Sequence, residues 1–405
     1  MLHNLGRIRR MYQAFPRPLG LLVAGNGLTA AGGSMVWPFL PLYISARLAT
    51  DLTSVGLLLA WQAVIGVVGT VLAGPLVDRL GRKTTLILGL IGVAAAYVAL
   101  AFAHTWLHFA ATLGLMGLFG PAIPIALNAI IADMTQGPAR ERAYAALRAA
   151  NNAGIALGPM VGGWLLVTRP AWAFYAAGTA LLLFAGLVVF ALPETRPAMP
   201  QTSQGDRAAS LSLLDVVRDG RLLRFLAPTL LVLMAQSLIW IYLSIIMRDE
   251  YGLAEDMYRW LVTTNALMVA TLQYGVTSTL QTRWPPRTIL AVGALFVASA
   301  GVAAWFATSF WTFWTAMVLM TVGEMLLAPS TQNWVASLAP ADARGRYMAA
   351  LAFAWALSTM LAAPLGGWLK DHWHARAVWM ATIGLATTAA LLYARGAHQP
   401  QERAA

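Results

Sequence analysis

One acidic residue, Glu324, lies deep within a long apolar segment of the chain, Met320-Thr-Val-Gly-Glu324-Met-Leu-Leu-Ala-Pro329. An ionised side chain at the centre of a bilayer costs on the order of 3 kcal/mol, so such residues usually face a cavity and serve a function. A carboxyl group that binds a proton in a dry cavity and releases it to water could carry protons across a membrane. The sequence therefore predicts Glu324 as the proton-coupling residue. The alternative is a permanently neutral glutamic acid held between helices.

Uncharged polar and aromatic side chains recur within the other apolar segments. Each of them alone could serve helix packing or anchor a helix at the membrane interface. Together with the abundant methionine they predict a roomy, mostly apolar cavity, which suits lipophilic or amphiphilic molecules better than sugars. The predicted lining residues are Asn26, Trp37, Trp61, Gln62, Asn128, Arg148, Asn151, Asn152, Gln236, Trp240, Asn265, Gln273, Gln332 and Asn333. Arg148 could instead extend its guanidinium to the membrane surface.

The elements that position these residues are membrane-spanning helices. Hydrophobic residues make up 59% of the 405 residues and charged residues 11%, a composition that a soluble domain could not bury. The apolar runs are also too long and too uniform for a β-barrel. With about 20 residues needed per crossing, twelve helical spans are predicted. They are 18–43, 53–77, 84–103, 108–132, 143–168, 171–192, 223–248, 257–280, 288–308, 310–336, 347–370 and 375–395.

The basic residues indicate the orientation of these spans. The formal net charge is +11, and 21 of the 27 Lys and Arg residues fall on one side if the N-terminus is placed inside. The positive-inside rule therefore predicts that both termini lie in the cytoplasm, and we call the two predicted sides inner and outer. The first span lacks a small-residue cleavage site, so we expect a retained helix and no signal peptide.

The segment Gly74-Pro-Leu-Val-Asp78-Arg79-Leu-Gly81-Arg82-Lys83 follows the second span. It resembles the loop between the second and third helices of major facilitator superfamily transporters. The resemblance implies that Asp78 accepts hydrogen bonds at the start of the eleventh span and that Arg82 pairs with Asp133. Such a contact would be an inner gating latch made of Gly74, Asp78, Arg79, Gly81, Arg82, Lys83 and Asp133. The alternative is that these charges only set topology and a tight turn.

Span five contains Gly154-Ile-Ala-Leu-Gly158-Pro159-Met-Val-Gly162-Gly163. This pattern resembles that of drug/proton antiporters in the same superfamily. Glycines four residues apart share one helix face, and Pro159 favours a bend, so we expect a flat contact between the two halves of the protein. Ordinary helix packing is the alternative. The chain lacks an arginine early in span four and a second acidic residue near Asn151, which leaves a coupling scheme with a single carboxylate.

The two halves of the chain repeat each other. Ala139 to Leu147 resembles Ala343 to Leu351, and Gly162-Gly-Trp-Leu returns as Gly366-Gly-Trp-Leu, both at an offset of 204 residues. The resemblance implies two six-helix bundles, 1–192 and 223–405, with the substrate site between them. Residues 193–222 are expected to form a cytoplasmic linker, which contains either a short amphipathic helix or a solvated loop. Only the first copy of the loop is complete, since Thr282 stands where Asp78 would map.

Several other classes of protein are disfavoured. The chain has no cysteine, and no nucleophile elbow, phosphate-binding loop, metal cluster or dinucleotide motif is present, so we expect no enzyme, no cofactor and no metal site. The basic residues are distributed over the loops of one predicted side of the membrane and do not form one basic face, which disfavours nucleic acid as a partner. We expect a monomeric secondary transporter in the inner membrane that exports lipophilic small molecules in exchange for protons, surrounded by lipid. The alternatives are a lipid or glycolipid flippase of the same fold and a receptor or scaffold that does not transport.

Overall fold

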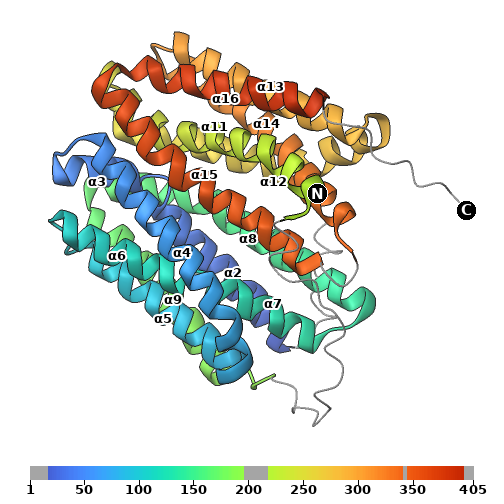
Figure 1. Ribbon diagram of the computed structural model, residues 1–405. Helices are drawn as coiled ribbons and strands as arrows, with labels where there is room; N and C mark the ends of the chain where they lie inside the picture. The colour runs from blue at the N-terminus through green and yellow to red at the C-terminus, as the bar shows by residue number, and fades with distance from the viewer. Residues whose placement is uncertain (1–16, 196–217, 341–343, 396–405) are drawn as a thin grey trace, which may run out of the picture. The chain divides into compact units, whose positions relative to one another are not determined.

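The computed structural model describes residues 17–195, 218–340 and 344–395 (Figure 1). Every element in these ranges is a helix, and the helices follow the predicted spans to within a few residues. The predicted fold class, an all-α membrane protein, is therefore confirmed. The amphipathic helix considered for the linker falls mostly on residues 196–217 and lies outside the described residues.

The helices can be taken in two groups along the chain. The first group is α2 (Arg17–Val36), α3 (Leu40–Leu48), α4 (Leu52–Leu80), α5 (Arg82–Leu100), α6 (Trp106–Phe119), α7 (Ala122–Met134), α8 (Gly137–Thr168) and α9 (Pro170–Ala191). The second group is α11 (Gly220–Tyr251), the 3-10 helix η1 (Glu255–Met257), α12 (Tyr258–Arg283), α13 (Pro286–Phe306), α14 (Phe310–Leu338), α15 (Arg344–His372) and α16 (Ala375–Arg395).

Two predicted spans are each interrupted once. The first consists of α2 and α3, with a turn at Trp37–Phe39, and the fourth consists of α6 and α7, with a break at Gly120–Pro121. Proline has no amide hydrogen to donate and its ring collides with the preceding turn, which explains breaks at Pro38 and Pro121. Helix α14 carries Pro329 and continues through it, so proline alone does not decide where a span breaks.

Ten of the twelve spans are long and apolar enough to cross a bilayer by composition. The two exceptions, α8 and α12, are 32 and 26 residues long, so polarity and not length sets them apart. Helix α8 carries Arg148, Asn151 and Asn152, and α12 carries Asn265 and Gln273. Polar helices in a membrane protein usually face protein or a water-filled path and not lipid, which is consistent with the cavity predicted from these residues.

The chain divides into two compact units. The first contains Met1–Leu48 and Trp61–Pro200, and the second contains Ala49–Ala60 and Gln201–Ala405. The first turns of α4 thus belong to the second unit, whereas the sequence analysis placed them in the first half. Close contact between these turns and α15 explains the difference: a side chain on Gly56 would collide with the backbone of Ala363.

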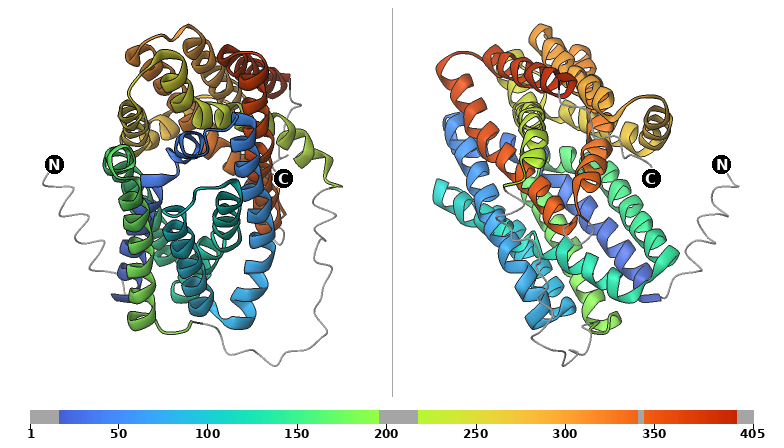
Figure 2. Two further views of the ribbon diagram at one scale, coloured as in Figure 1. Left: turned by 90° about the vertical axis from the view of Figure 1, so that its left-hand side faces the viewer. Right: turned by 45° about the vertical axis from the view of Figure 1, so that its right-hand side comes forward.

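Within the first unit, α2 packs against α8 and α9, and α5 packs against α6, α7 and α9 (Figure 2). Within the second unit, α13 packs against α14 and α16, α11 against α15 and α16, and α12 against α14. Fully buried aromatic side chains fill the two interiors: Phe109, Phe174 and Phe184 in the first unit, and Tyr242, Phe313 and Trp379 in the second.

The helices repeat at the same offset of 204 residues as the sequence. Helices α5 and α13 begin at Arg82 and Pro286, and α6 and α14 begin at Trp106 and Phe310. Helices α8 and α15 end at Thr168 and His372. The connections are short in both copies: Arg169 alone separates α8 from α9, and two residues separate α15 from α16. The repeat therefore extends over whole helices and their connections.

Candidate functional site

Glu324 forms a polar cluster with two residues of its own unit. The amide nitrogen Nδ2 of Asn265, on α12, donates to Glu324 Oε2 at 2.9 Å and to Thr321 Oγ1 at 3.0 Å. The Thr321 hydroxyl donates in turn to the Met317 carbonyl oxygen at 2.7 Å, within α14. The Glu324 side chain is half-buried. The structure thus joins two residues that the sequence predicted separately, Glu324 and Asn265, and adds Thr321.

The packing of α14 explains why Glu324 faces α12. Gly323 packs against α13: a side chain added at this position would meet the Gly293 carbonyl oxygen and the Val297 side chain. The next residue is rotated by about 100° around the helix, which directs it away from α13. A second bond fixes the register of α12 and α14, because Trp314 Nε1 donates to Thr264 Oγ1 at 2.9 Å. The carboxylate is therefore held by two helices and not left on a mobile loop.

The loop after α4 contains the ion pair that the resemblance implies. Arg82 Nε lies 3.1 Å from Asp133 Oδ2, at the end of α7, and Arg82 Nη1 lies 3.6 Å from Asp78 Oδ1. The side chains of Arg82 and Asp133 are 15% and 21% exposed, whereas that of Asp78 is 75% exposed. The exposed carboxylate has room for a further partner. The expected contact of Asp78 with the start of the eleventh span would join the two units and stays a prediction.

Glu194 is a member of this cluster that the sequence analysis missed. Its carboxylate accepts hydrogen bonds from the backbone amides of Arg82 at 2.9 Å and Lys83 at 3.2 Å, so it caps the start of α5. Thr195 Oγ1 lies 3.3 Å from Asp133 Oδ2. Gly81, at φ 98°, adopts a conformation that favours glycine and brings the turn against Glu194. The signal available was an acidic residue directly after span six, in Pro193-Glu-Thr.

The glycines of span five contact α2 of the same unit, which corrects the expected contact between halves. Side chains at Gly154, Gly158 and Gly162 would collide with backbone atoms of Gly27, Ala31 and Met35 respectively. Ser34 Oγ also donates to the Gly154 carbonyl oxygen at 3.2 Å. The spacing was correctly interpreted as one flat helix face, but α2 of the same unit covers it. Ordinary packing accounts for these glycines.

The other predicted cavity residues come from both units, and two of them bond to a neighbouring helix of their own unit. Asn26 Nδ2 donates to the Leu147 carbonyl on α8 at 3.4 Å, and Trp61 Nε1 donates to the Ala110 carbonyl on α6 at 2.9 Å, so both tie helices together. The amide nitrogen of Gln236 is buried and, in the part of the chain described, has no hydrogen-bond acceptor. The side chains of Trp37, Asn128, Arg148, Gln332 and Asn333 are exposed in their own units.

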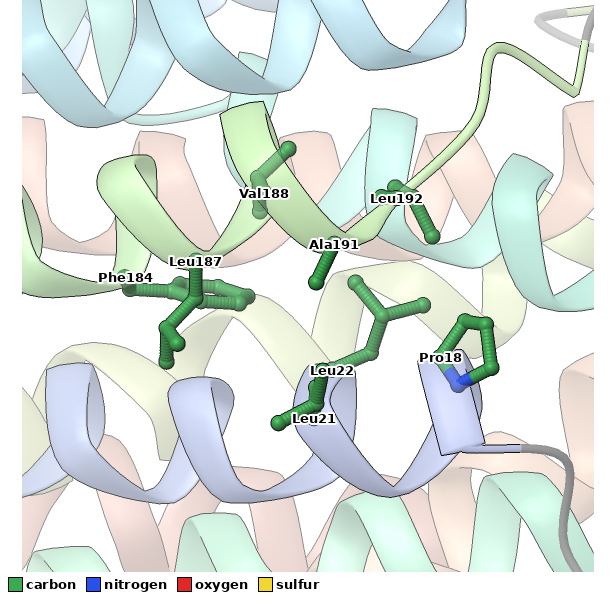
Figure 3. A pocket seen from close by; sticks show the side chains of 8 residues that line it. All are labelled: Pro18, Leu21, Leu22, Phe184, Leu187, Val188, Ala191 and Leu192. Carbon is green, nitrogen blue, oxygen red and sulfur yellow. The ribbon is translucent and has the colours of Figure 1, made fainter.

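A small apolar pocket lies between the start of α2 and the end of α9 (Figure 3). It is lined by Pro18, Leu21, Leu22, Phe184, Leu187, Val188, Ala191 and Leu192. None of these side chains carries a polar atom, so the pocket offers nothing to orient a substrate, and it includes none of the predicted site residues.

Comparison with known proteins gives one consistent result. A family model described as Major Facilitator Superfamily matches residues 22–235 and 225–405. The chain is 27% identical over 392 residues to the uncharacterized MFS-type transporter YttB of Bacillus subtilis, covering 93% of this chain and 95% of that protein. It is 25% identical over 358 residues to the multidrug resistance protein MdtH of Yersinia enterocolitica, covering 88% of each. A solved D-xylose-proton symporter has the same fold, with a TM-score of 0.76 at 15% identity, covering 93% of this chain and 96% of that one.

Proposed function

Because the chain belongs to the Major Facilitator Superfamily and is a membrane transporter of that family, we propose that it exports lipophilic or amphiphilic small molecules by proton antiport. In this mechanism the carrier opens alternately to the two sides of the membrane. Proton uptake on one side and release on the other drive the cargo outward.

The observation that carries the proposal is the Glu324 cluster. A half-buried carboxylate within a membrane helix is costly and is usually retained for function. The Asn265 amide can donate to the carboxylate when it is ionised and to the carbonyl oxygen when it is protonated. The side chain therefore keeps one partner in both protonation states, which holds it in place while the proton comes and goes.

Support for the cargo class comes from the composition of the helices and from the relatives. The polar side chains within the spans are mainly amides, hydroxyls and indoles, which provide few fixed charges for a polar cargo. Apolar surroundings with a few polar groups favour lipophilic ligands of varied shape. The MdtH relatives, named multidrug resistance proteins, support export of this kind.

The orientation and gating belong to the same proposal. Both termini face the cytoplasm of a bacterial-type inner membrane, the protein acts as a monomer, and a proton gradient is the energy source. The pair of Arg82 with Asp133 supports a gating role for the loop after α4, since it holds the end of α7 to the start of α5. Asp78, with its exposed carboxylate, would then engage the other unit on the inner side in one state.

The test is transport by purified protein in proteoliposomes with an imposed pH gradient. A panel of lipophilic cations and neutral dyes is the cargo, and a pH-sensitive dye reports proton movement. We expect gradient-driven cargo movement with opposite proton flux, and we expect Glu324→Gln to abolish it while cargo still binds. Glu255→Gln is the matched control, because it makes the same chemical change on the short helix η1, outside the spans.

Unchanged gradient dependence in Glu324→Gln would remove this residue from the mechanism. Movement of fluorescent lipid between leaflets, without movement of any dye, would assign the protein to lipid translocation instead.

A further inference from the structure

The start of α4 is capped by two carboxylates, one from the adjacent residue and one from a distant part of the chain. The first amides of a helix have no acceptors within it and need outside partners. Asp371 Oδ1 accepts from the Leu52 amide at 3.1 Å, and Asp371 Oδ2 accepts from the Thr53 amide at 2.7 Å. The Thr53 hydroxyl also donates to Asp371 Oδ2 at 2.7 Å. The next amide, that of Ser54, donates to Asp51 Oδ2 at 2.9 Å.

The two caps differ in origin. Asp51 directly precedes α4 and moves with it, and a hydrogen bond from the Ser54 side chain lowers the pKa of its carboxyl group. Asp371 lies one residue before the end of α15, more than 300 residues away in the chain. Both contacts lie inside the second unit, which includes Ala49–Ala60. One cap is therefore local and permanent, and the other depends on α15 staying beside α4.

The surrounding contacts make this a close and smooth junction. A side chain on Gly367 would collide with the Leu52 carbonyl, and one on Gly56 with the Ala363 carbonyl, so the two backbones touch with no side chain between them. One residue earlier on α15, Lys370 Nζ lies 2.6 Å from Glu250 Oε1 at the end of α11. The end of α15 is thus anchored to α11 while Asp371 reaches α4.

We propose that Asp371 is a reversible outer latch, which caps α4 while the outer side is closed and releases it when that side opens. The proposal rests on the alternating access of the proposed function. A carboxylate and two amides can each be taken up by water at the membrane surface, so separating them costs little compared with separating apolar side chains. Such a contact can hold a closed state without trapping the protein in it.

The latch has a counterpart at the inner side. Asp78 lies two residues before the end of α4, and Asp371 lies one residue before the end of α15. In the proposed mechanism Asp78 caps the start of α15 when the inner side is closed. The same two helices would then exchange caps, each by the carboxylate near its own end. The first copy of the repeat has Val167 at the position of Asp371, so the outer latch exists once.

The experiment measures distances between spin labels, which need no cargo and no proton gradient. The chain has no cysteine, so labels can be placed on cysteines introduced at Leu57 and Trp373, both exposed. Asp371→Asn should increase the ratio of the separated to the closed population about tenfold. Asp51→Asn is the matched control, since it weakens the same helix start through its local cap and should leave the ratio unchanged.

An equal shift in both variants, or no shift in Asp371→Asn, would overturn the latch. A second measurement joins Thr53→Cys to Asp371→Cys by a disulfide, which we expect to lock the label distance at its short value until a reductant is added. A crosslinked protein that still separates would also overturn the proposal. Loss of proton coupling in the proteoliposome assay leaves both results unaffected, so failure of the latch can be told apart from failure of proton coupling.

Discussion

In the first half of the chain, Gly120 and Trp61 stand at the positions that Glu324 and Asn265 occupy 204 residues later. The second half has a carboxylate held by an amide, and the first has a helix break at Gly120–Pro121 and an indole that donates to a carbonyl of α6. Trp61 and Asn265 each tie two neighbouring helices together. Only the second half has a carboxylate there that can exchange a proton. The two halves share their architecture and differ in their chemistry.

Packing positions have changed less between the halves. Gly89 contacts Ala122 and Ile123, and its counterpart Gly293 contacts Leu326 and Leu327, which are the equivalent positions. Gly162 lies against α2, and Gly366 lies against α11, the equivalent helix. At these two positions a close helix contact keeps the residue small in both copies, whereas the polar groups at the Glu324 and Asn265 positions differ.

The largest expected effect concerns these packing glycines. Gly162→Ala would place a methyl group against the backbone of Met35, whereas Gly366→Ala would press on the side chains of Tyr242 and Leu238. Backbone cannot move aside as a side chain can, so we expect Gly162→Ala to cost about 3 kcal/mol of stability and Gly366→Ala less. Thermal unfolding followed by size-exclusion chromatography measures both.

Gly186→Ala is the control for this pair, because a methyl group there meets no atom within 4 Å. If all three variants unfold at the same temperature, the close contacts do not limit stability and the comparison of packing between the halves fails.

A smaller effect is expected from the amide partner of Glu324. Asn265→Leu keeps a similar volume and removes the hydrogen bond to the carboxylate. Bonds to charged groups contribute about 1.5–3 kcal/mol, so proton-driven transport should fall by roughly tenfold or more. Initial rates in proteoliposomes with a pH gradient test this. Trp61→Phe removes the bond at the equivalent position in the first half, and equal losses in both variants would contradict a special role for the second-half pair.

The smallest effect is expected at the loop after α4. Arg82→Gln breaks the partly buried pair with Asp133 and should lower the maximal transport rate severalfold with little change in cargo binding. Arg287, which follows the equivalent turn in the second half, is exposed, so Arg287→Gln should leave the rate unchanged. Similar rates for both variants would show that the complete loop has no advantage over its incomplete copy.

Most of the fold could be predicted from hydrophobic runs and short motifs. Long apolar segments need no knowledge of distant contacts, which is why span boundaries such as those of 375–395 agree with α16 (Ala375–Arg395). The pair of Arg82 and Asp133 was also accessible, because the loop pattern is specific. The helix that covers the glycine face could not be predicted, because the spacing of Gly154, Gly158 and Gly162 indicates a flat surface but not which helix packs on it.

Residues that act at helix ends were the ones missed. Glu194 and Asp371 look like surface acids in the sequence, and their roles depend on which helix start folds back onto them. Thr321 was missed because a hydroxyl within a membrane helix usually bonds to its own backbone, as this one also does. Long-range pairing of this kind leaves no local pattern in the sequence.

Two connections leave no room for added residues. One residue separates α8 from α9, and two residues separate α15 from α16. Inserting a fluorescent domain or an affinity tag at Arg169 would pull apart two helices that meet almost end to end. Divergence between the two copies has accordingly proceeded by exchange of side chains, with several helix starts and ends kept at the same offset of 204 residues.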